Sequence, residues 1–239
     1  MGSPERFEQK ISVLGCGGNG QLALQILSSM GYNVEFFDGD TVEKTDLRRQ
    51  SLFSIEDVGK NKARVCMEKI HMLNGSRKVM GIGEYVDSNN IDSLLGNSKL
   101  IIDATDSFIT RELLNEFSIK RNIPMIFSSS FGNMGQIKCI IPGKTSCLHC
   151  LTGGKKLVPL NCHYDRVDPF VPQIISSNLA AFADFILSGR DITGDLYIFN
   201  FSDFGIEKIK VNRNMECEVC VKNKYNYLES EKIVGRQLI

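Results

Sequence analysis

Two pairs of cysteines in this sequence have the spacing of metal ligands. Cys147 and Cys150 form one C-x-x-C motif, and Cys217 and Cys220 form a second one far downstream. Four cysteine thiolates match the tetrahedral coordination that Zn²⁺ prefers, and such a closed shell leaves no open position for a substrate. We therefore expect one shared zinc ion with a structural role, which joins two distant segments. A redox-active C-x-x-C pair is the alternative interpretation.

A glycine-rich turn near the N-terminus has the pattern of a nucleotide-binding loop. The spacing G-x-G-x-x-G occurs between an apolar strand predicted at residues 11–14 and a helix predicted at residues 21–30. The glycines of this turn are Gly15, Gly17, Gly18 and Gly20. Such a turn allows backbone N–H groups and the N-terminus of the helix to face a phosphate. A tight turn without a ligand is the alternative, but the position between strand and helix favours a nucleotide.

Charged residues after the next predicted strand, at residues 34–37, indicate which nucleotide. Asp38 ends this strand, where a carboxylate can accept hydrogen bonds from both ribose hydroxyls, although a cap or turn role would also suit an aspartate. Cations cluster in the segment that follows, and this much positive charge suits a triphosphate better than a dinucleotide pyrophosphate. Taken singly, each cation would be a solvated surface residue. The residues that we expect to contact the nucleotide here are Asp38, Asp40, Arg49, Gln50 and Lys62.

Two further carboxylates follow a buried strand predicted at residues 100–104. Asp103 and Asp106 emerge at the carboxyl end of this strand, beside the glycine turn, where ligands lie in open α/β sheets. A carboxylate in this place can hold Mg²⁺ that bridges phosphate oxygens. The alternative is that Asp103 or Ser107 caps the helix that begins near Thr110.

The elements that must position these side chains alternate between strand and helix over the first half of the chain. Helical patterns occur at residues 60–74, 91–95 and 110–121, and further strands are predicted at residues 78–83 and 124–128. These β-α-β units predict an α/β fold with a doubly wound, mostly parallel, Rossmann-like sheet. The distal half is β-rich, with strands at residues 136–141, 196–201 and 206–211 and an apolar core helix at residues 174–187.

The composition argues against several classes of partner. The 28 basic and 28 acidic residues balance, so we expect no bulk attraction to nucleic acid or to an anionic membrane. No apolar run approaches the length of a membrane span, and the N-terminus lacks the apolar core of a secretory signal. Without an export signal, the eight cysteines indicate thiols and metal ligands, which favours the cytoplasm.

The four cysteines outside the two motifs divide into two groups. Cys16, Cys66 and Cys139 lie in regular-element patterns, where a buried small apolar residue is expected. Cys162 lies in a long polar loop beside His163, and a cationic neighbour would favour the thiolate form. Cys162 is therefore a candidate nucleophile, with chance placement as the alternative.

Together these residues resemble the ThiF/MoeB/HesA family of adenylating enzymes, which are related to ubiquitin activation and include activators of sulfur carrier proteins. The likeness extends over about residues 11–221, and its motifs occur in the family's order: the glycine turn, Asp38, Leu47-x-Arg49-Gln50, Lys62, Asp103-x-Thr105-Asp106, Gly132-x-x-Gly135-Gln136 and the two C-x-x-C pairs. The resemblance implies a single adenylation domain over residues 1–239, with the nucleotide-binding part at about 8–130 and the carboxylate-substrate and zinc part at about 131–225.

The resemblance also implies an ATP-dependent reaction. A carboxylate, in the family usually the C-terminal glycine of a ubiquitin-like carrier, attacks the α-phosphate of MgATP and releases pyrophosphate; this chemistry needs mainly positioning and charge neutralisation. By the same resemblance Asp38 would hold the ribose, Arg49 and Lys62 the phosphates, and Asp106 the Mg²⁺. Cys162 would take part in a later transfer step, and the protein would form a homodimer.

Three departures from the family pattern leave alternatives open. Asp46 stands where the family usually has Asn, and unless Mg²⁺ screens it or it turns away, it should weaken ATP binding. Ser107 likewise replaces a common Asn, and the family's N-terminal helical arm has no clear equivalent, with Arg6 as its weak candidate. The alternatives are adenylation of a small-molecule or peptide carboxylate, a non-catalytic partner subunit, and an NAD-dependent oxidoreductase.

Overall fold

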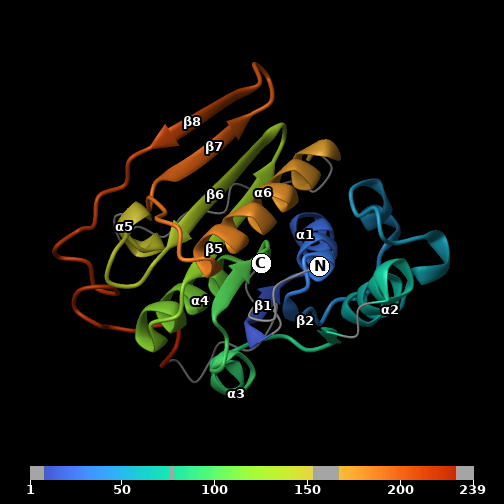
Figure 1. Ribbon diagram of the computed structural model, residues 1–239, viewed down its shortest axis with the longest axis horizontal. Helices are drawn as coiled ribbons and strands as arrows, with labels where there is room; N and C mark the ends of the chain where they lie inside the picture. Colours follow the sequence, from blue (N-terminus) through green and yellow to red (C-terminus); the bar gives the residue numbers. More distant parts are fainter. Residues whose placement is uncertain (1–7, 76–77, 153–166, 230–239) are drawn as a thin grey trace.

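The computed structural model describes residues 8–75, 78–152 and 167–229, and its centre is one eight-stranded sheet. The strands lie in the order β3-β2-β1-β4-β5-β6-β7-β8 (Figure 1). Their bounds are β1 Lys10–Leu14, β2 Asn33–Phe37, β3 Val79–Ile82, β4 Leu100–Asp103, β5 Met125–Phe131, β6 Met134–Ile140, β7 Leu196–Asn200 and β8 Gly205–Ile209. Neighbouring strands among β3, β2, β1, β4 and β5 pair in parallel. Strands β6, β7 and β8 continue the sheet with antiparallel pairing. The predicted α/β class with a mostly parallel sheet and a β-rich distal half is therefore confirmed.

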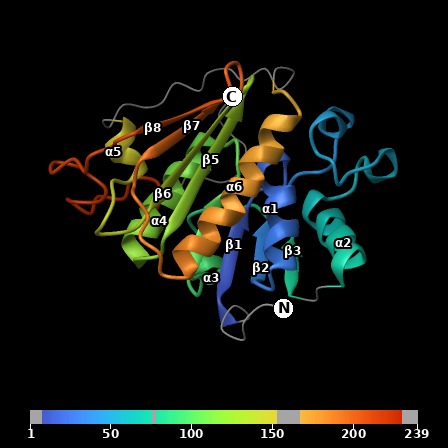
Figure 2. The ribbon, with the colours of Figure 1, turned by 45° about the horizontal axis from the view of Figure 1, so that its top comes forward.

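Helices cover both faces of this sheet. Their bounds are α1 Gly18–Ser29, α2 Lys62–Asn74, α3 Ile91–Leu95, α4 Phe108–Arg121, α5 Leu148–Thr152 and α6 Phe170–Leu187, with short 3₁₀ helices η2 Lys44–Arg48 and η3 Ile55–Asp57. Helices α1, α2 and α6 lie on one face, and α3, α4 and α5 lie on the other (Figures 1 and 2). Such two-sided cover is what strands that are apolar on both faces require.

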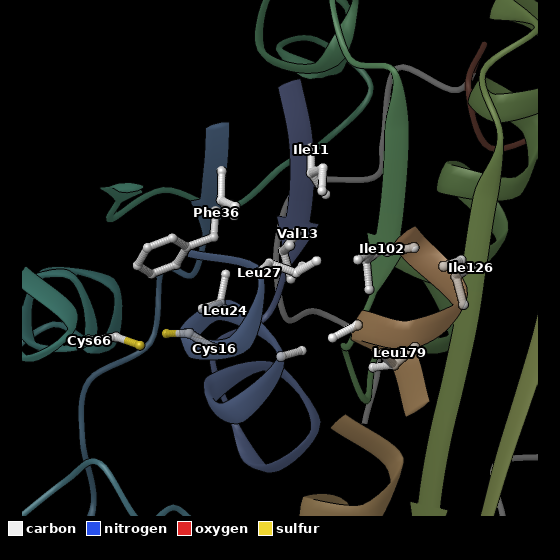
Figure 3. Packing of buried hydrophobic residues seen from close by; sticks show 14 of the residues in the cluster. Ile11, Val13, Cys16, Leu24, Leu27, Phe36, Cys66, Ile102, Ile126 and Leu179 are labelled. Atoms are coloured by element: carbon white, nitrogen blue, oxygen red, sulfur yellow. The ribbon is translucent and has the colours of Figure 1, made fainter. Parts of the chain in front are cut away.

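Each central strand feeds two separate apolar clusters because successive side chains point to opposite faces. Val13 of β1 packs with Leu24 of α1 and Leu179 of α6, as Figure 3 shows. Leu14, the next residue, belongs to the cluster that contains Phe117 of α4. The parallel register then aligns the carboxyl ends of β1, β2 and β4, because Leu14 pairs with Phe37 on one side and with Asp103 on the other.

Three buried cysteines belong to this core. Cys16, Cys66 and Cys139 have no exposed surface, so the expectation that they act as small apolar residues is confirmed. Cys16 and Cys66 lie close together between α1 and α2 (Figure 3). Burial raises the pKa of the Cys139 thiol to about 12, which keeps it protonated.

Helix α6 is the one helix of the described residues that is long and apolar enough to cross a membrane. The core helix of a globular domain passes the same test of length and composition. Here α6 packs against α1 and against β5 and β6, and Val171, Ile175 and Leu179 are fully buried. These contacts are those of a core helix, as the apolar pattern predicts.

The strand order determines where a ligand can bind. From β1 the chain builds outward through β2 and β3 on one side and through β4 and β5 on the other, so the connections diverge between β1 and β4. In open α/β sheets the crevice at the carboxyl ends of two such strands is the usual ligand site. Leu14 of β1 is in register with Asp103 of β4, which places the glycine turn and the second carboxylate motif at this crevice.

Candidate functional site

The glycine turn between β1 and α1 packs so closely that two of its residues have no room for a side chain. Gly15 has a φ of 90°, and a Cβ atom there would lie 2.7 Å from the carbonyl oxygen of Ala104. A Cβ atom on Gly20 would lie 2.0 Å from the carbonyl oxygen of Gly15. Only glycine fits both positions without displacing the backbone. The turn thereby brings the start of α1 against the end of β4.

The N-terminus of α1 is arranged to face an anion. Its N-cap is Gly17, and among the described residues no side chain caps the helix and no acidic residue stands in its first turn. N–H groups in the first turn of a helix lack intrahelical partners and carry partial positive charge. A Cβ atom on Gly17 would have Gln50 Nε2, 3.6 Å away, as its nearest neighbour, so this side of the turn faces Gln50.

Asp38 lies at the end of β2 beside this turn, as predicted. Its Oδ2 atom accepts a hydrogen bond from the backbone N–H of Cys16 at 2.9 Å, and its Oδ1 atom accepts one from the N–H of Asp40 at 2.9 Å. Burial raises the pKa of the Asp38 carboxyl, and these two N–H groups oppose the rise. The N–H groups fix the direction of the carboxylate, which is the arrangement required of a group that accepts hydrogen bonds from a ribose.

The predicted phosphate-binding residues gather around one buried carboxylate, that of Asp46. Lys62 Nζ lies 3.2 Å from Asp46 Oδ2 and 3.7 Å from Asp40 Oδ2. Arg49 Nη2 lies 3.8 Å from Asp46 Oδ1, and Gln50 Nε2 donates to the same oxygen at 2.7 Å. The structure thus brings together Asp40, Arg49, Gln50 and Lys62, which are separated in the sequence by η2 and η3.

Two observations at this cluster test whether a nucleotide fits. Burial alone would lower the pKa of Lys62, but the carboxylates of Asp38 and Asp46 outweigh it and raise this pKa, so the lysine stays charged. Gln50 is 3% exposed, and its Oε1 atom has no hydrogen-bond partner among the described residues. A buried acceptor without a donor costs about 1–3 kcal/mol, and a polar ligand can supply the donor. A charged lysine and an unsatisfied amide beside a bare helix N-terminus fit a phosphorylated ligand.

The two predicted carboxylates after β4 have different surroundings. Asp103 is fully buried and accepts hydrogen bonds from Arg111 Nε at 3.1 Å, from the Thr105 backbone N–H at 3.0 Å and from the Thr105 hydroxyl at 2.7 Å. Asp106 is exposed at the same edge. Asp103 therefore holds Arg111 and the Thr105 backbone in place, while Asp106 is the exposed carboxylate of the pair. Ser107 caps α4 by accepting a hydrogen bond from Thr110 N–H at 3.2 Å, as one alternative proposed.

Arg111 is a site residue that the sequence did not reveal. Its guanidinium lies over the ring of Phe127, 4.5 Å from the centroid, and also donates to the Thr105 carbonyl oxygen at 2.9 Å. No motif marks it, since one arginine in an amphipathic helix is indistinguishable from a solvated surface residue.

Arg111 also lines a cavity of about 250 Å³ between α4, α5 and the strands β5 to β7. Gln136, from the predicted Gly135-Gln136 strand, and Glu112 share this cavity with apolar side chains. Burial and then the neighbouring Glu116 raise the pKa of the Glu112 carboxyl to about 7. The cavity lies between Arg111 of α4 and the helix α5 that contains Cys150.

The four cysteines of the two C-x-x-C motifs lie together at the distal end, with all four Sγ atoms within 4.8 Å of one another. Sulfur separations are 3.8 Å for Cys147–Cys150, 3.7 Å for Cys147–Cys217 and 3.5 Å for Cys150–Cys220. A tetrahedral zinc with Zn–S bonds of 2.3 Å requires sulfur separations of about 3.8 Å. The thiol of Cys147 donates to Cys150 and lowers the pKa of Cys150 to about 4. Three of the six sulfur separations therefore match those of a tetrahedral zinc site, and all six lie within 4.8 Å, so four thiolates are gathered where one zinc ion could bind.

Groups around the cysteine cluster hold both segments in place. Asn115 Oδ1 accepts the Leu148 N–H at 3.0 Å, and Arg213 Nη2 donates to the Cys220 carbonyl oxygen at 2.6 Å. Lys138 is fully buried in β6, and its Nζ atom donates to Ser146 Oγ at 2.9 Å and to the Gly194 carbonyl oxygen. Ser146 immediately precedes Cys147. The sequence patterns singled out none of these supporting side chains.

Cys162, the candidate nucleophile, and its neighbour His163 lie outside the described residues, as does Arg6. The role predicted for Cys162 therefore stays a prediction. The roles assigned to individual nucleotide contacts are likewise predictions, which the geometry above makes specific.

Comparison with known proteins identifies relatives of this chain. The model of the ThiF family matches residues 5–219. A sulfur carrier protein adenylyltransferase of Thermus thermophilus is 30% identical over 228 residues, which cover 90% of this chain and 84% of that protein. The SAMP-activating enzyme E1 of Haloferax volcanii is 27% identical over 234 residues, or 95% of this chain and 86% of that enzyme.

A third relative is similar over a shorter segment. The sulfur carrier protein ThiS adenylyltransferase of Bacillus subtilis is 32% identical over 153 residues, or 63% of this chain. That match covers 46% of the Bacillus protein, so the likeness spans about half of its length.

Solved structures with the same fold include MccB of E. coli. A crystal structure of MccB with AMPCPP and MccA superposes with a TM-score of 0.78 at 24% identity, over 90% of this chain and 67% of the MccB chain. At this identity the likeness supports the fold alone. It agrees with the mixed sheet described above.

Proposed function

This chain belongs to the ThiF family as an adenylyltransferase, and we propose that it activates the C-terminal carboxylate of a small ubiquitin-like sulfur carrier protein. The main support for this proposal is the geometry at the ends of β1 and β4. There the uncapped N-terminus of α1 lies in the same crevice as Arg49, Lys62 and the exposed Asp106. The names of the Thermus and Bacillus relatives support a sulfur carrier as the substrate class. Because the chain belongs to the ThiF family, the alternative of an NAD-dependent oxidoreductase has no support.

The ribose, the phosphates and the magnesium ion of the nucleotide each have a proposed partner in this site. Asp38 accepts hydrogen bonds from the ribose hydroxyls, because its carboxylate is held at the end of β2 by two backbone N–H groups. The N-terminus of α1 and the cations Arg49 and Lys62 face the phosphates. Asp106 would hold Mg²⁺, which when bound neutralises charge on the phosphate oxygens.

The reaction proposed for this site is a displacement at the α-phosphorus. One oxygen of the carrier's carboxylate attacks the α-phosphorus, the bond from that phosphorus to the bridging oxygen of the β-phosphate breaks, and pyrophosphate leaves with the electron pair. The product is a mixed anhydride of the carrier and AMP, and no proton has to move. The residues therefore contribute by holding the reacting atoms in line and by neutralising charge.

We place the end of the carrier tail beside Arg111, at the cavity that Gln136 also lines. Asp103 and the Phe127 ring fix the guanidinium of Arg111, so this side chain offers an immobile positive charge next to the crevice. The cavity of about 250 Å³ suits a narrow extended tail with small residues better than a folded domain.

The cysteine cluster has a structural part in this proposal. Four sulfurs close the coordination shell of a zinc ion, so the ion would join the segment after β6 to the segment after β8 and would take no part in adenylation. Two further predictions come from the family resemblance. We expect the protein to form a homodimer, and we expect Cys162 to take part in a transfer step after adenylation.

ATP–pyrophosphate exchange tests this function directly. The full chain is assayed with MgATP and radiolabelled pyrophosphate alone, with carrier proteins that end in Gly-Gly, and with small carboxylic acids. Exchange that requires a Gly-Gly carrier supports the proposal, and exchange with a free acid would move the substrate to small-molecule or peptide carboxylates. Exchange under no condition, with carriers from the same genome included, would support the non-catalytic subunit instead.

A further inference from the structure

The proposed phosphate site contains an anion of its own. Asp46 is 4% exposed and lies between the two cations of the site, with Lys62 Nζ at 3.2 Å and Arg49 Nη2 at 3.8 Å. Its remaining contacts come from Gln50 Nε2 at 2.7 Å and from the Glu43 backbone N–H at 3.0 Å. The carboxylate is therefore directed at the phosphate-binding cations and does not turn toward solvent.

Asp46 is also close to the glycine turn. Gln50, which donates to Asp46, is the side chain that a Cβ atom on Gly17 would meet at 3.6 Å. The Arg49 carbonyl oxygen lies 3.9 Å from the Cβ position of Gly18. A phosphate at the start of α1 would therefore be separated from the Asp46 carboxylate by a single side chain.

We propose that Asp46 sets the strength and the metal dependence of nucleotide binding, as an internal counter-ion that phosphates must displace from Lys62 and Arg49. The inference rests on the proposed function, because it concerns the same nucleotide site. A phosphate that approaches the two cations meets an anion that already occupies them, and it is repelled by that anion across a partly desolvated gap. Mg²⁺ on the nucleotide cancels part of this repulsion, so metal-free ATP is the species that Asp46 rejects most strongly.

The ligand's charge determines how large the effect should be. Metal-free ATP carries the most negative charge near Asp46, MgATP carries less, and AMP places only one phosphate at the turn. Replacing the carboxylate with a neutral amide should therefore tighten metal-free ATP most, MgATP and AMP less, and adenosine not at all.

The Asp46→Asn variant is well accommodated by the surrounding groups. The new carbonyl oxygen can keep the bond from the Glu43 N–H, which caps η2. If the Gln50 amide rotates by half a turn, its Oε1 atom, which lacks a partner at present, accepts the new N–H donor. The variant therefore changes charge with little change in shape.

Asp57 provides a matched control. It occupies the same N3 position in a capping box of the next 3₁₀ helix, η3, where Ser54 is the N-cap, and it is 5% exposed. Its cationic partners are Lys69 and Lys60, neither of which belongs to the proposed phosphate site. Asp57→Asn removes the same charge from an equivalent local structure away from the nucleotide.

The test is isothermal titration calorimetry on the full chain, wild type, Asp46→Asn and Asp57→Asn, with ATP plus EDTA, MgATP, AMP and adenosine. We expect Asp46→Asn to lower the Kd for ATP in EDTA about tenfold, to lower that for MgATP about threefold or less, and to leave adenosine unchanged. Asp57→Asn should leave all four values unchanged. Unchanged ATP binding in EDTA, or weaker MgATP binding in Asp46→Asn, would overturn the proposal, because Asp46 would then be a structural cap or a metal ligand.

The same titrations separate this inference from the proposed function. If wild type binds MgATP and supports exchange while Asp46→Asn binds ATP no better, the inference alone fails. If neither protein binds any adenine nucleotide, the assignment of the nucleotide site is wrong, and both the inference and the proposed function are contradicted. Tighter ATP binding in Asp46→Asn without exchange by either protein would support the inference and leave the catalytic function contradicted.

Discussion

The nucleotide crevice and the cysteine cluster both bury polar groups against the same sheet, but they do so in opposite ways. At the crevice, ion pairs to Asp46 are 3.2 and 3.8 Å long, and the buried Gln50 Oε1 atom lacks a partner among the described residues. At the cluster, sulfur separations of 3.5 to 3.8 Å match one tetrahedral ion. The crevice has loosely paired charges that a ligand can exchange, whereas the cluster gathers the four ligands that one tetrahedral metal ion requires.

This difference indicates where substitutions should affect chemistry and where they should affect stability. An unsatisfied buried polar group costs free energy that a ligand can recover, so a binding site is expected to retain some of them. A closed metal shell contributes its binding free energy to folding and leaves no position for a substrate. Variants at the two places should therefore separate activity from stability.

The largest effect is expected from the loss of a cluster cysteine. Cys217→Ser should remove bound zinc and lower the free energy of unfolding by about 4 kcal/mol or more, because a structural metal contributes to folding directly. Zinc content by mass spectrometry and thermal unfolding measure both effects. Cys139→Ala is the control, because this buried cysteine on β6 lies outside the cluster. The Cys139→Ala protein should therefore keep its bound zinc. Full zinc content and an unchanged melting temperature in Cys217→Ser would refute a structural zinc site.

The next effect concerns the crevice and should leave the fold intact. Asp106→Ala should reduce ATP–pyrophosphate exchange about 100-fold or more, because it removes the exposed carboxylate proposed to hold Mg²⁺. Its melting temperature should stay within about 2 °C of wild type, since Asp106 is exposed. Asp92→Ala, at an exposed carboxylate on α3 paired with Arg121, should leave exchange unchanged. Exchange near the wild-type rate in Asp106→Ala would mean that another group holds the metal.

The crevice is the region that the sequence predicted best. The strands that end at Leu14, Phe37 and Asp103 were each predicted to within two residues, because apolar runs bounded by turn residues define short buried strands. Parallel connection then requires their carboxyl ends to share one edge. The positions of the glycine turn, Asp38 and Asp103 follow from local pattern and from this one rule of topology.

The side-chain partners within that crevice were beyond local pattern. Asp103 and Asp106 have the same residue type and nearly the same position, yet Arg111 and Thr105 enclose the first and leave the second exposed. The five-residue helix α5 was not predicted, because it is too short to show a helical period in the sequence. Strands β5 and β6 form one hairpin and β7 and β8 another, but the pairing of β6 with β7 joins segments more than 50 residues apart and cannot be read from local pattern.

Between the two regions, the cavity beside Arg111 gives a prediction about pH. Burial and then Glu116 raise the pKa of Glu112 to about 7, above the ordinary value of 4.5, so the folded protein holds this proton more tightly than the unfolded chain does. This contribution to stability is complete below about pH 4.5 and is lost as the pH rises through about 7. It should amount to about 2–3 kcal/mol between pH 5 and pH 8.

Glu112→Gln isolates this contribution, because the amide keeps the shape and cannot ionise. Urea unfolding at pH 5 and at pH 8 should show a smaller loss of stability with pH in this variant than in wild type. Glu207→Gln, at an exposed position on β8, is the control and should keep the wild-type slope. An identical slope in wild type and Glu112→Gln would show that the carboxyl ionises as freely as in the unfolded chain.

The smallest effect is expected at Lys138, which shows most clearly why the cluster end was harder to predict. Nothing in the sequence distinguishes Lys138 of β6 from a solvated surface lysine, yet its side chain is fully buried. Burial lowers the pKa of Lys138, while the thiols of Cys139 and Cys147 oppose this change. A positive charge that interacts with Cys147 and Cys150 should stabilise the negative charge of the thiolates when a zinc ion is bound.

Lys138→Met should therefore act in opposite directions with and without the metal. Zinc-loaded protein should lose its ion to a chelator up to about tenfold faster, because the negatively charged thiolate shell loses a compensating cation. Zinc-free protein should become slightly more stable, since a buried ammonium that has lost the thiolate charge is replaced by an apolar side chain of similar length. Chelator competition and thermal unfolding of both forms measure the two effects. A uniform loss of stability in both forms would mean that Lys138 acts only through its hydrogen bonds to Ser146 and Gly194, and the cluster would then be complete without any compensating charge.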